Sequence, residues 1–306
     1  MKLLVSFVLA TFAVGALSQC TCPTLKWGMC DASPCVCTHP VDQGVKLPLD
    51  CNKLIPKCFL MKIESYRARN QLSTRTGIGG KPVETAIVDN DGIYDPDCEV
   101  DGKFKARQCN NTDVCWCVNS AGVRRTDKGD QNLKCDELVE TYWVRLELTH
   151  KPFGGVLNQA NLQSAMVDVM QKRYNFTADS APEVQYDQDA RKIVVDVKKP
   201  VGDRRKDLPR MAYYMEKDIK ALPLFLKTDP FQATVAGQPL QMENIIIYYV
   251  DEKGPTFTMK QLTKGVIAVI VVVILLVVAG LIGLYFLRRR ERAQYSKAQA
   301  REMENM

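Results

Sequence analysis

The chain has 306 residues, of which 46% are hydrophobic and 25% are charged, and its formal net charge is +6. Lys2 carries one of these charges and residues 288–306 carry a net three, so only +2 remains for everything between them. So small an excess excludes a nucleic-acid-binding surface as the main function.

Residues 1–18 are predicted to be a cleaved secretory signal peptide. Lys2 precedes an almost unbroken apolar stretch from Leu3 to Leu17, and the small residues Ala16 and Ser18 come just before the expected mature start at Gln19. This arrangement is typical of a signal peptide and is too short for a membrane anchor. The residues that follow are therefore expected to fold in an oxidising compartment.

All twelve cysteines lie between Cys20 and Cys135. Structural zinc sites and redox centres both usually have two residues between paired cysteines (C-x-x-C), whereas the spacing here is C-x-C. We therefore favour disulfides over a metal or redox site, although spacing alone does not assign the pairs. Because small modules bury little core, we expect disulfides to hold residues 19–135 together. The three C-x-C pairs are Cys20/Cys22, Cys35/Cys37 and Cys115/Cys117.

Residues 136–252 contain no cysteine and are expected to fold by ordinary burial of a core. Alternating apolar residues predict strands, and apolar residues at helical spacing predict helices, the second of which starts at the capping residue Asp207. The order β-α-β-β-α-β-β predicts an α+β domain, with an antiparallel-rich sheet and two helices on one face. The predicted strands are 141–149, 183–186, 192–197, 231–235 and 244–250, and the first helix is 156–174.

Residues 265–287 are predicted to cross a membrane. They are 23 residues without a charge, and as a helix they would span about 34 Å against a hydrocarbon core of about 30 Å. Arginines at 288, 289, 290 and 292 follow at once and place the C-terminus in the cytosol. We predict a single-pass type I membrane protein with a stalk at 253–264 and a cytoplasmic tail at 288–306, which is unstructured or weakly helical.

Two kinds of site can be predicted from short motifs. Ala279 and Gly283 lie four residues apart in the predicted span, a spacing that lets a second helix approach closely. Asn110 and Asn175 begin N-x-T motifs on the extracellular side, so both are predicted glycosylation sites.

No catalytic, cofactor-binding or metal-binding constellation is predicted. His39 and His150 are the two histidines of the chain, and we expect both at the surface rather than acting as bases. The sequence has no G-x-S-x-G, H-E-x-x-H or phosphate-loop motif. We therefore predict that the protein is not an enzyme and takes no small-molecule substrate.

Residues 58–135 resemble the thyroglobulin type-1 module. Tyr94-Asp95-Pro96-Asp97-Cys98 is followed by Gly102, Phe104 and Gln108-Cys109, and then by Cys115-Trp116-Cys117-Val118 with Gly122 after it. The resemblance implies the disulfides Cys58–Cys98, Cys109–Cys115 and Cys117–Cys135.

The whole chain resembles the family of the epithelial cell adhesion molecule (EpCAM) and the trophoblast surface antigen. The strings NDGIYDPDC, CWCVNSAGVRRTDK, TYWVRLEL, AYYMEKDIK, IIIYYVDEK and GVIAVIVVV carry this resemblance. It implies a cysteine-rich module at 19–57 with the disulfides Cys20–Cys35, Cys22–Cys51 and Cys30–Cys37. The basic loop at 66–82 lacks the Arg-Arg dipeptide at which cleavage would be expected.

The resemblance implies a glycoprotein of the epithelial plasma membrane, at lateral or junctional contacts, that acts in homotypic adhesion and signalling. The expected partner is a second copy of the chain, side by side in one membrane (cis) or across two cells (trans), with the thyroglobulin-type loop docked on the α+β domain. Claudins and tetraspanins are further implied partners in the membrane. The alternative is a tethered cysteine-protease inhibitor, because some thyroglobulin type-1 modules enter cysteine-protease clefts.

Overall fold

The structure is a computed structural model of the chain. It describes residues 20–72, 94–109, 113–178, 181–220, 223–227, 229, 231–257 and 264–304. The predicted signal peptide at 1–18 lies outside the described residues, as does most of the loop at 66–82. Residues 1–256 and 257–306 form two compact units, which are described separately.

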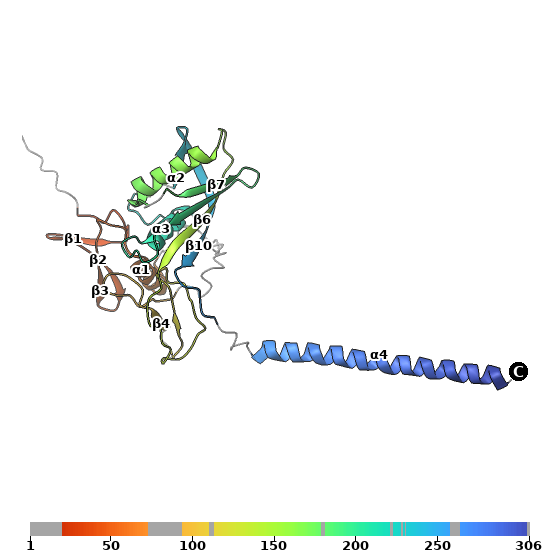
Figure 1. Ribbon diagram of the computed structural model, residues 1–306. Helices are drawn as coiled ribbons and strands as arrows, with labels where there is room; N and C mark the ends of the chain where they lie inside the picture. Colours follow the sequence, from red (N-terminus) through yellow and green to blue (C-terminus); the bar gives the residue numbers. More distant parts are fainter. Residues whose placement is uncertain are drawn as a thin grey trace, which may run out of the picture. The chain divides into compact units, whose positions relative to one another are not determined.

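The first folded part of the chain is a three-stranded antiparallel sheet (Figure 1). Leu25 and Val41 are buried there in a small core. So small a core contributes little stability, and disulfides supply the rest. The strands are β1 (Met29–Ala32), β2 (Cys35–Asp42) and β3 (Val45–Leu49), and the disulfides are Cys20–Cys35, Cys22–Cys51 and Cys30–Cys37.

The second part is built around Trp116. This side chain is 3% exposed and packs edge-to-face on Tyr94, with ring centroids 5.3 Å apart. A Cβ atom on Gly122 would lie 2.6 Å from the Phe104 ring, and the φ of +77° also favours glycine there. This part contains α1 (Lys57–Arg69), β4 (Arg107–Cys109) and β5 (Cys115–Cys117), with the disulfides Cys58–Cys98, Cys109–Cys115 and Cys117–Cys135.

All twelve cysteines are therefore paired, which confirms the disulfide-rich character of this half of the chain. The pairs are those implied by the family resemblance. The sequence patterns do not predict α1, although its apolar residues at 60, 61 and 63 are buried.

The third part is a five-stranded antiparallel sheet in the order β7-β8-β6-β10-β9. Two helices pack on one face of it (Figure 1), so the predicted α+β class and element order are confirmed. The elements are β6 (Thr141–His150), α2 (Gln159–Tyr174), β7 (Glu183–Asp187), β8 (Lys192–Lys198), α3 (Leu208–Lys220), β9 (Gln232–Val235) and β10 (Gln238–Asp251).

Strand β10 begins earlier than the predicted range of 244–250. Its first residues, Gln238–Gln241, pair with β9 across a turn at Ala236 and Gly237, where both residues have positive φ. From Met242 onward the strand pairs with β6 instead, with a register irregularity between Met242 and Asn244. Two successive partners therefore extend one strand well beyond its apolar run.

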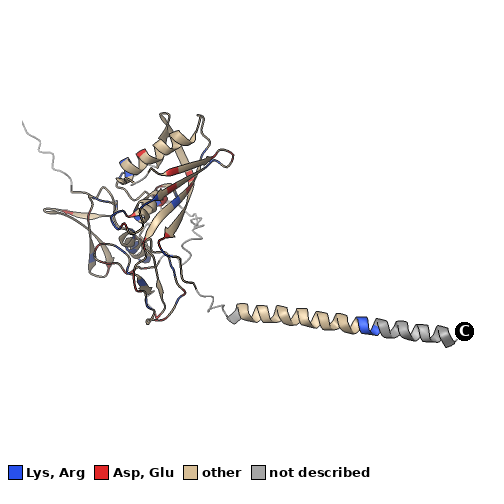
Figure 2. Ribbon diagram, viewed as in Figure 1, with Lys and Arg blue, Asp and Glu red and all other residues tan. Residues whose placement is uncertain are grey.

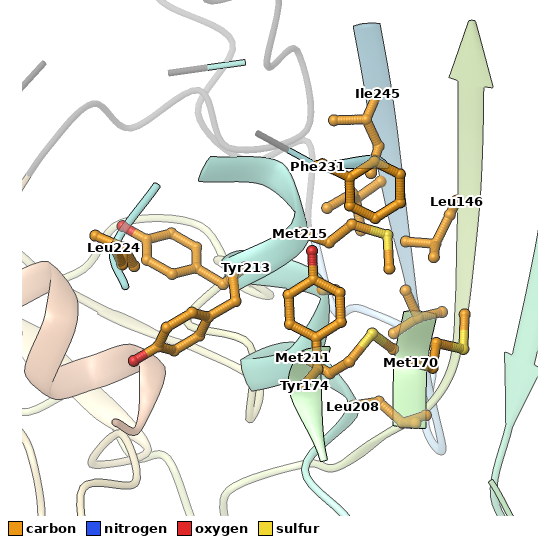
Figure 3. Close-up of a cluster of buried hydrophobic side chains, with 14 of the residues drawn as sticks. Leu146, Met170, Tyr174, Leu208, Met211, Tyr213, Met215, Leu224, Phe231 and Ile245 are labelled. Atoms are coloured by element: carbon orange, nitrogen blue, oxygen red, sulfur yellow. The ribbon is translucent and has the colours of Figure 1, made fainter. Parts of the chain in front are cut away.

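The core of this domain lies between the sheet and the two helices (Figure 3). Leu146 and Ile245 project from central strands and are fully buried. They face Met211 and Met215 of α3 and Met170 of α2, whose flexible thioethers fill the layer between helix and sheet.

Asp218 of α3 is a charged group inside this core. Its Oδ2 accepts hydrogen bonds from Arg173 Nε at 2.7 Å and from the Tyr174 hydroxyl at 2.8 Å, while its Oδ1 has no partner among the described residues. Burial raises the pKa of the Asp218 carboxyl, and the bond to Arg173 opposes that shift.

Buried polar contacts join the second and third parts of the first unit. Glu64 of α1 accepts hydrogen bonds from the Tyr213 hydroxyl at 3.0 Å and from Lys217 Nζ at 2.7 Å, both on α3. Lys57 donates to the Ala121 carbonyl at 2.6 Å and lies over the rings of Tyr213 and Tyr249. Removing one partner of such a pair would leave a buried charge uncompensated, so the contacts fix these two parts in one arrangement.

The last residue of β10 and the five residues after it form a segment that we call the strap, 251–256. Asp251 accepts from Arg125 Nε at 3.0 Å and from Asn119 Nδ2 at 2.9 Å, and the Arg125 guanidinium also donates to the carbonyls of Lys253 and Gly254. The first residues of the predicted stalk are thus bonded to the thyroglobulin-type module.

The second unit is the helix α4 (Lys264–Glu304). Within the described residues it is the one helix long and apolar enough to cross a membrane, over Val266–Arg290 with mean hydropathy 3.4. Figure 2 shows this span without charged residues until the basic band at Arg288–Arg290. The helix continues through the predicted tail to Glu304, beyond the weak helicity expected there.

We predict that Leu146→Ala destabilises the ectodomain by about 2–5 kcal/mol, because it leaves a cavity in a fully buried position of a central strand. Urea unfolding with the disulfides intact measures the change. Val156→Ala is the control: this side chain is 81% exposed, so its free energy of unfolding should change by less than about 0.5 kcal/mol. Equal effects at the two positions would contradict the assigned core.

We predict that Asp218→Asn changes how stability depends on pH. A carboxyl whose folded-state pKa is raised binds protons more readily when folded, so the wild type gains stability as pH falls through that pKa toward the unfolded value of about 3.9. Asp218→Asn has no carboxyl to protonate at this position, so it should not show this gain in stability. Unfolding at pH 7 and at pH 4.5 should therefore show the wild type improving relative to Asp218→Asn on acidification, and a constant difference would contradict the raised pKa.

Candidate functional site

The face of the five-stranded sheet that points away from α2 and α3 is the candidate site. Along β6, Val144, Leu146 and Leu148 are fully buried toward the helices. Trp143, Arg145, Glu147 and Thr149 are only half-buried, because successive side chains of a strand point to opposite faces. Within the part of the chain that the structure describes, α2 and α3 do not cover this second row of side chains.

Strand pairing extends that row across three strands. Trp143 is directly opposite Lys198 and Val250, and Arg145 is directly opposite Asp196 and Tyr248. We call the resulting surface the outer sheet face. It consists of Trp143, Arg145, Glu147, Val194, Asp196, Lys198, Ile246, Tyr248 and Val250.

Asp196 lies at the centre of the outer sheet face, and its side chain is 3% exposed. Its Oδ1 accepts from Trp143 Nε1 and from Arg145 Nε, each at 2.8 Å, and its Oδ2 accepts from Arg145 Nη2 at 2.8 Å. The hydrogen bonds from Arg145 hold the pKa of the Asp196 carboxyl below its usual range, despite partial burial. The carboxylate therefore stays charged at neutral pH.

Further ion pairs surround this centre. Lys198 Nζ lies 3.0 Å from a Glu183 oxygen and 5.0 Å from the centre of the Trp143 ring, and Lys192 pairs with Glu147 at 3.3 Å. The result is a half-buried aromatic and aliphatic surface with its charges already paired. Tryptophan and arginine are enriched at the energetic centres of protein interfaces, so this chemistry suits contact with another protein.

A second surface feature lies on the thyroglobulin-type module. The backbone turns at Glu99–Gly102, where the Gly102 amide donates to the Glu99 carbonyl at 3.0 Å and Gly102 has a φ of +84°. Val100 at its tip is fully exposed. The disulfide Cys58–Cys98 anchors the base of this turn, which therefore presents an apolar side chain on a fixed support.

Both histidines are buried at 2% exposure, so the expectation that they lie at the surface is wrong. Each ring donates from Nδ1 to the carbonyl of the next residue at 2.6 Å, and His150 Nε2 also lies 3.1 Å from the Tyr186 hydroxyl. Burial lowers the pKa of His39. Both rings serve as hydrogen-bonded packing groups within their strands.

The remaining predicted sites are scattered over the chain. Asn175 is exposed and ends α2 in the left-handed conformation, with φ at 46°. Since α2 covers the helix-bearing face, this residue lies on the side of the sheet opposite the outer sheet face. Asn110 lies outside the described residues. Ala279 and Gly283 lie within α4, and a Cβ added to Gly283 would meet nothing within 4 Å.

Two family models match the chain. One is described as EPCAM/Trop-2, C-terminal, and matches residues 141–251, the strands and helices that build the outer sheet face. The other is the thyroglobulin type-1 repeat, which matches residues 68–135. The two features of the candidate site therefore fall in two recognised domains.

The chain is also similar over nearly its full length to known proteins. The chain is 42% identical over 308 residues to human tumor-associated calcium signal transducer 2, covering 98% of this chain and 92% of that protein. It is 39% identical over 310 residues to mouse epithelial cell adhesion molecule, covering 98% and 94%. Human epithelial cell adhesion molecule is 39% identical over 313 residues, covering 99% and 95%.

We predict that Thr177→Ala removes a glycan from the ectodomain, because it destroys the Asn175-Phe176-Thr177 acceptor and leaves the left-handed Asn175 in place. Mass spectrometry of the secreted ectodomain before and after enzymatic deglycosylation measures this. Thr177→Ser keeps the acceptor and serves as the control. An unmodified Asn175 in the wild type would contradict the prediction.

Proposed function

This chain belongs to the EPCAM/Trop-2 family, and on that premise we propose that it is a cell-surface adhesion and signalling protein that acts by contact of its ectodomain with a second copy. The proposal places it at lateral or junctional contacts of epithelial cells. The alternative of a tethered cysteine-protease inhibitor has no specific support in these relationships. We propose contact, rather than catalysis, as its mode of action.

The outer sheet face is the observation that carries this proposal. Its central side chains, Trp143 and Arg145, are held by Asp196, and the two helices of the domain pack on the opposite side. The predicted glycan at Asn175 would also project from the helix-bearing side. Among the described residues, the helices of the domain leave this face uncovered, and its chemistry is that of an interface centre.

We propose that the docking group is the turn Glu99–Gly102 of the second copy. Val100 offers an exposed apolar side chain, and the acidic Glu99 and Asp101 beside it match the cations Arg145 and Lys198. Because each copy carries both a turn and a face, a two-fold axis would form two equal contacts. Such a closed pair suits copies that lie side by side in one membrane.

We also propose lateral association through α4. Ala279 and Gly283 share one side of the helix at a spacing of four, and small residues allow close helix packing in lipid. A second copy is the first expected partner, and claudins or tetraspanins are partners that the family suggests.

The ectodomain, residues 1–256, is a compact unit with its own core and can be tested as a secreted protein. Sedimentation over a concentration series should show a reversible dimer, and Val100→Arg should weaken it by roughly tenfold or more, because the new cation would be buried at the contact opposite Arg145 and Lys198. Val201→Arg, at a position 69% exposed in another turn, is the matched control and should leave the dimer unchanged.

A strict monomer up to high micromolar concentration would contradict self-association. Tight inhibition of a cathepsin by that monomer would support the inhibitor alternative instead. If the dimer tolerates Val100→Arg but is lost with Trp143→Ala, the outer sheet face is kept as the docking surface and the turn Glu99–Gly102 is rejected as the docking group.

A further inference from the structure

We propose that Asp196 is a positioning residue that holds Trp143 and Arg145 in the geometry required for docking on the outer sheet face. The inference rests on the proposed function, because it assumes that this face receives a second copy. It adds a specific role for a residue that a partner would scarcely touch, since its side chain is 3% exposed.

The hydrogen bonds at Asp196 fix both neighbours at once. The carboxylate takes the indole N–H of Trp143 at 2.8 Å and two guanidinium nitrogens of Arg145, Nε and Nη2, also at 2.8 Å. A bidentate pair sets the plane of the guanidinium as well as its position. The indole bond sets the direction in which the Trp143 ring extends from β6.

Cations flank the same ring. Arg145 Cζ lies 5.2 Å and Lys198 Nζ 5.0 Å from the centre of the Trp143 ring, within range of cation–π attraction. Lys198 is held in turn by Glu183 at 3.0 Å. The position of each of these side chains is therefore fixed by a carboxylate on a neighbouring strand.

Fixing these side chains in advance favours binding. Each flexible side chain that a partner must immobilise lowers the affinity, because its rotamer freedom is lost on association. Asp196 immobilises Trp143 and Arg145 already during folding, and both belong to the residue types enriched at interface centres. The bonds from Arg145 keep the pKa of Asp196 below its usual range, so the arrangement persists at the pH of the cell surface.

The chain contains a closely matched control. Asp218 is also buried, and it also bonds an arginine and an aromatic donor, Arg173 and Tyr174. It lies in the helix-bearing core rather than on the outer sheet face. A loss of general stability should therefore appear in both Asp→Asn variants, whereas a loss of positioning should appear in one.

The experiment measures the dimer dissociation constant of the secreted ectodomain by sedimentation for Asp196→Asn, Trp143→Ala, their double variant and Asp218→Asn. Each is measured at a temperature at which thermal unfolding shows it to be fully folded. Asp196→Asn should weaken the dimer about tenfold and Asp218→Asn should not. The double variant should be weaker than Trp143→Ala by clearly less than tenfold, since the part of the effect of Asp196 that acts through the Trp143 ring is already lost and only the part through Arg145 remains.

The outcomes separate the inference from its premise. A dimer weakened by Trp143→Ala but not by Asp196→Asn would overturn the role of Asp196 alone. A dimer unaffected by Trp143→Ala would overturn the docking face itself, and the inference with it. Additive effects in the double variant, or equal weakening by Asp218→Asn, would assign Asp196 a structural role only. Crosslinking of the full-length variants on cells should follow the same order.

Discussion

The alternation of side chains along β6 is the constraint on which the proposed docking surface depends. Residues 144, 146 and 148 must be buried under α2 and α3 to form the core, and the period of two then sends Trp143 and Arg145 to the other side. A shift of one residue in the pairing would exchange the two faces. Core burial and the composition of the outer sheet face are therefore two consequences of one register.

Disulfides and ion pairs hold the rest of the ectodomain in a fixed arrangement around this sheet. Six disulfides hold a half of the chain that has little core, and buried pairs such as Glu64 with Lys217 join it to the sheet domain. A turn on one module and a face on another are thereby held in a fixed relation. In the proposed contact between two copies, rigid presentation of both would reduce the entropy lost on association.

Much of the α+β domain was predictable from sequence, because its elements have clear periodicity. Strand β6 and helix α2 follow apolar alternation and helical spacing closely, whereas the hairpin that lengthens β10 depends on a turn and two successive partners. Helix α1 was missed because its buried face includes Lys57, Glu64 and Ser65, which find partners in other parts of the fold. Both histidines continue buried alternations, so the signal that contradicted their expected exposure was present. The network at Asp196 could not be foreseen, because it depends on which residue of β8 lies opposite Arg145.

The strap has a mechanical consequence. Where the chain leaves the sheet domain toward α4, Arg125 donates hydrogen bonds to Asp251 and to the carbonyls of Lys253 and Gly254. Beyond these bonds, Thr256 forms a parallel β-bridge with Thr126. Tension applied along the chain from the membrane end would therefore load the thyroglobulin-type module before it could peel β10 from β6. Disulfides brace the part of the molecule that meets the force first, and the hydrogen-bonded sheet behind it is shielded from tearing.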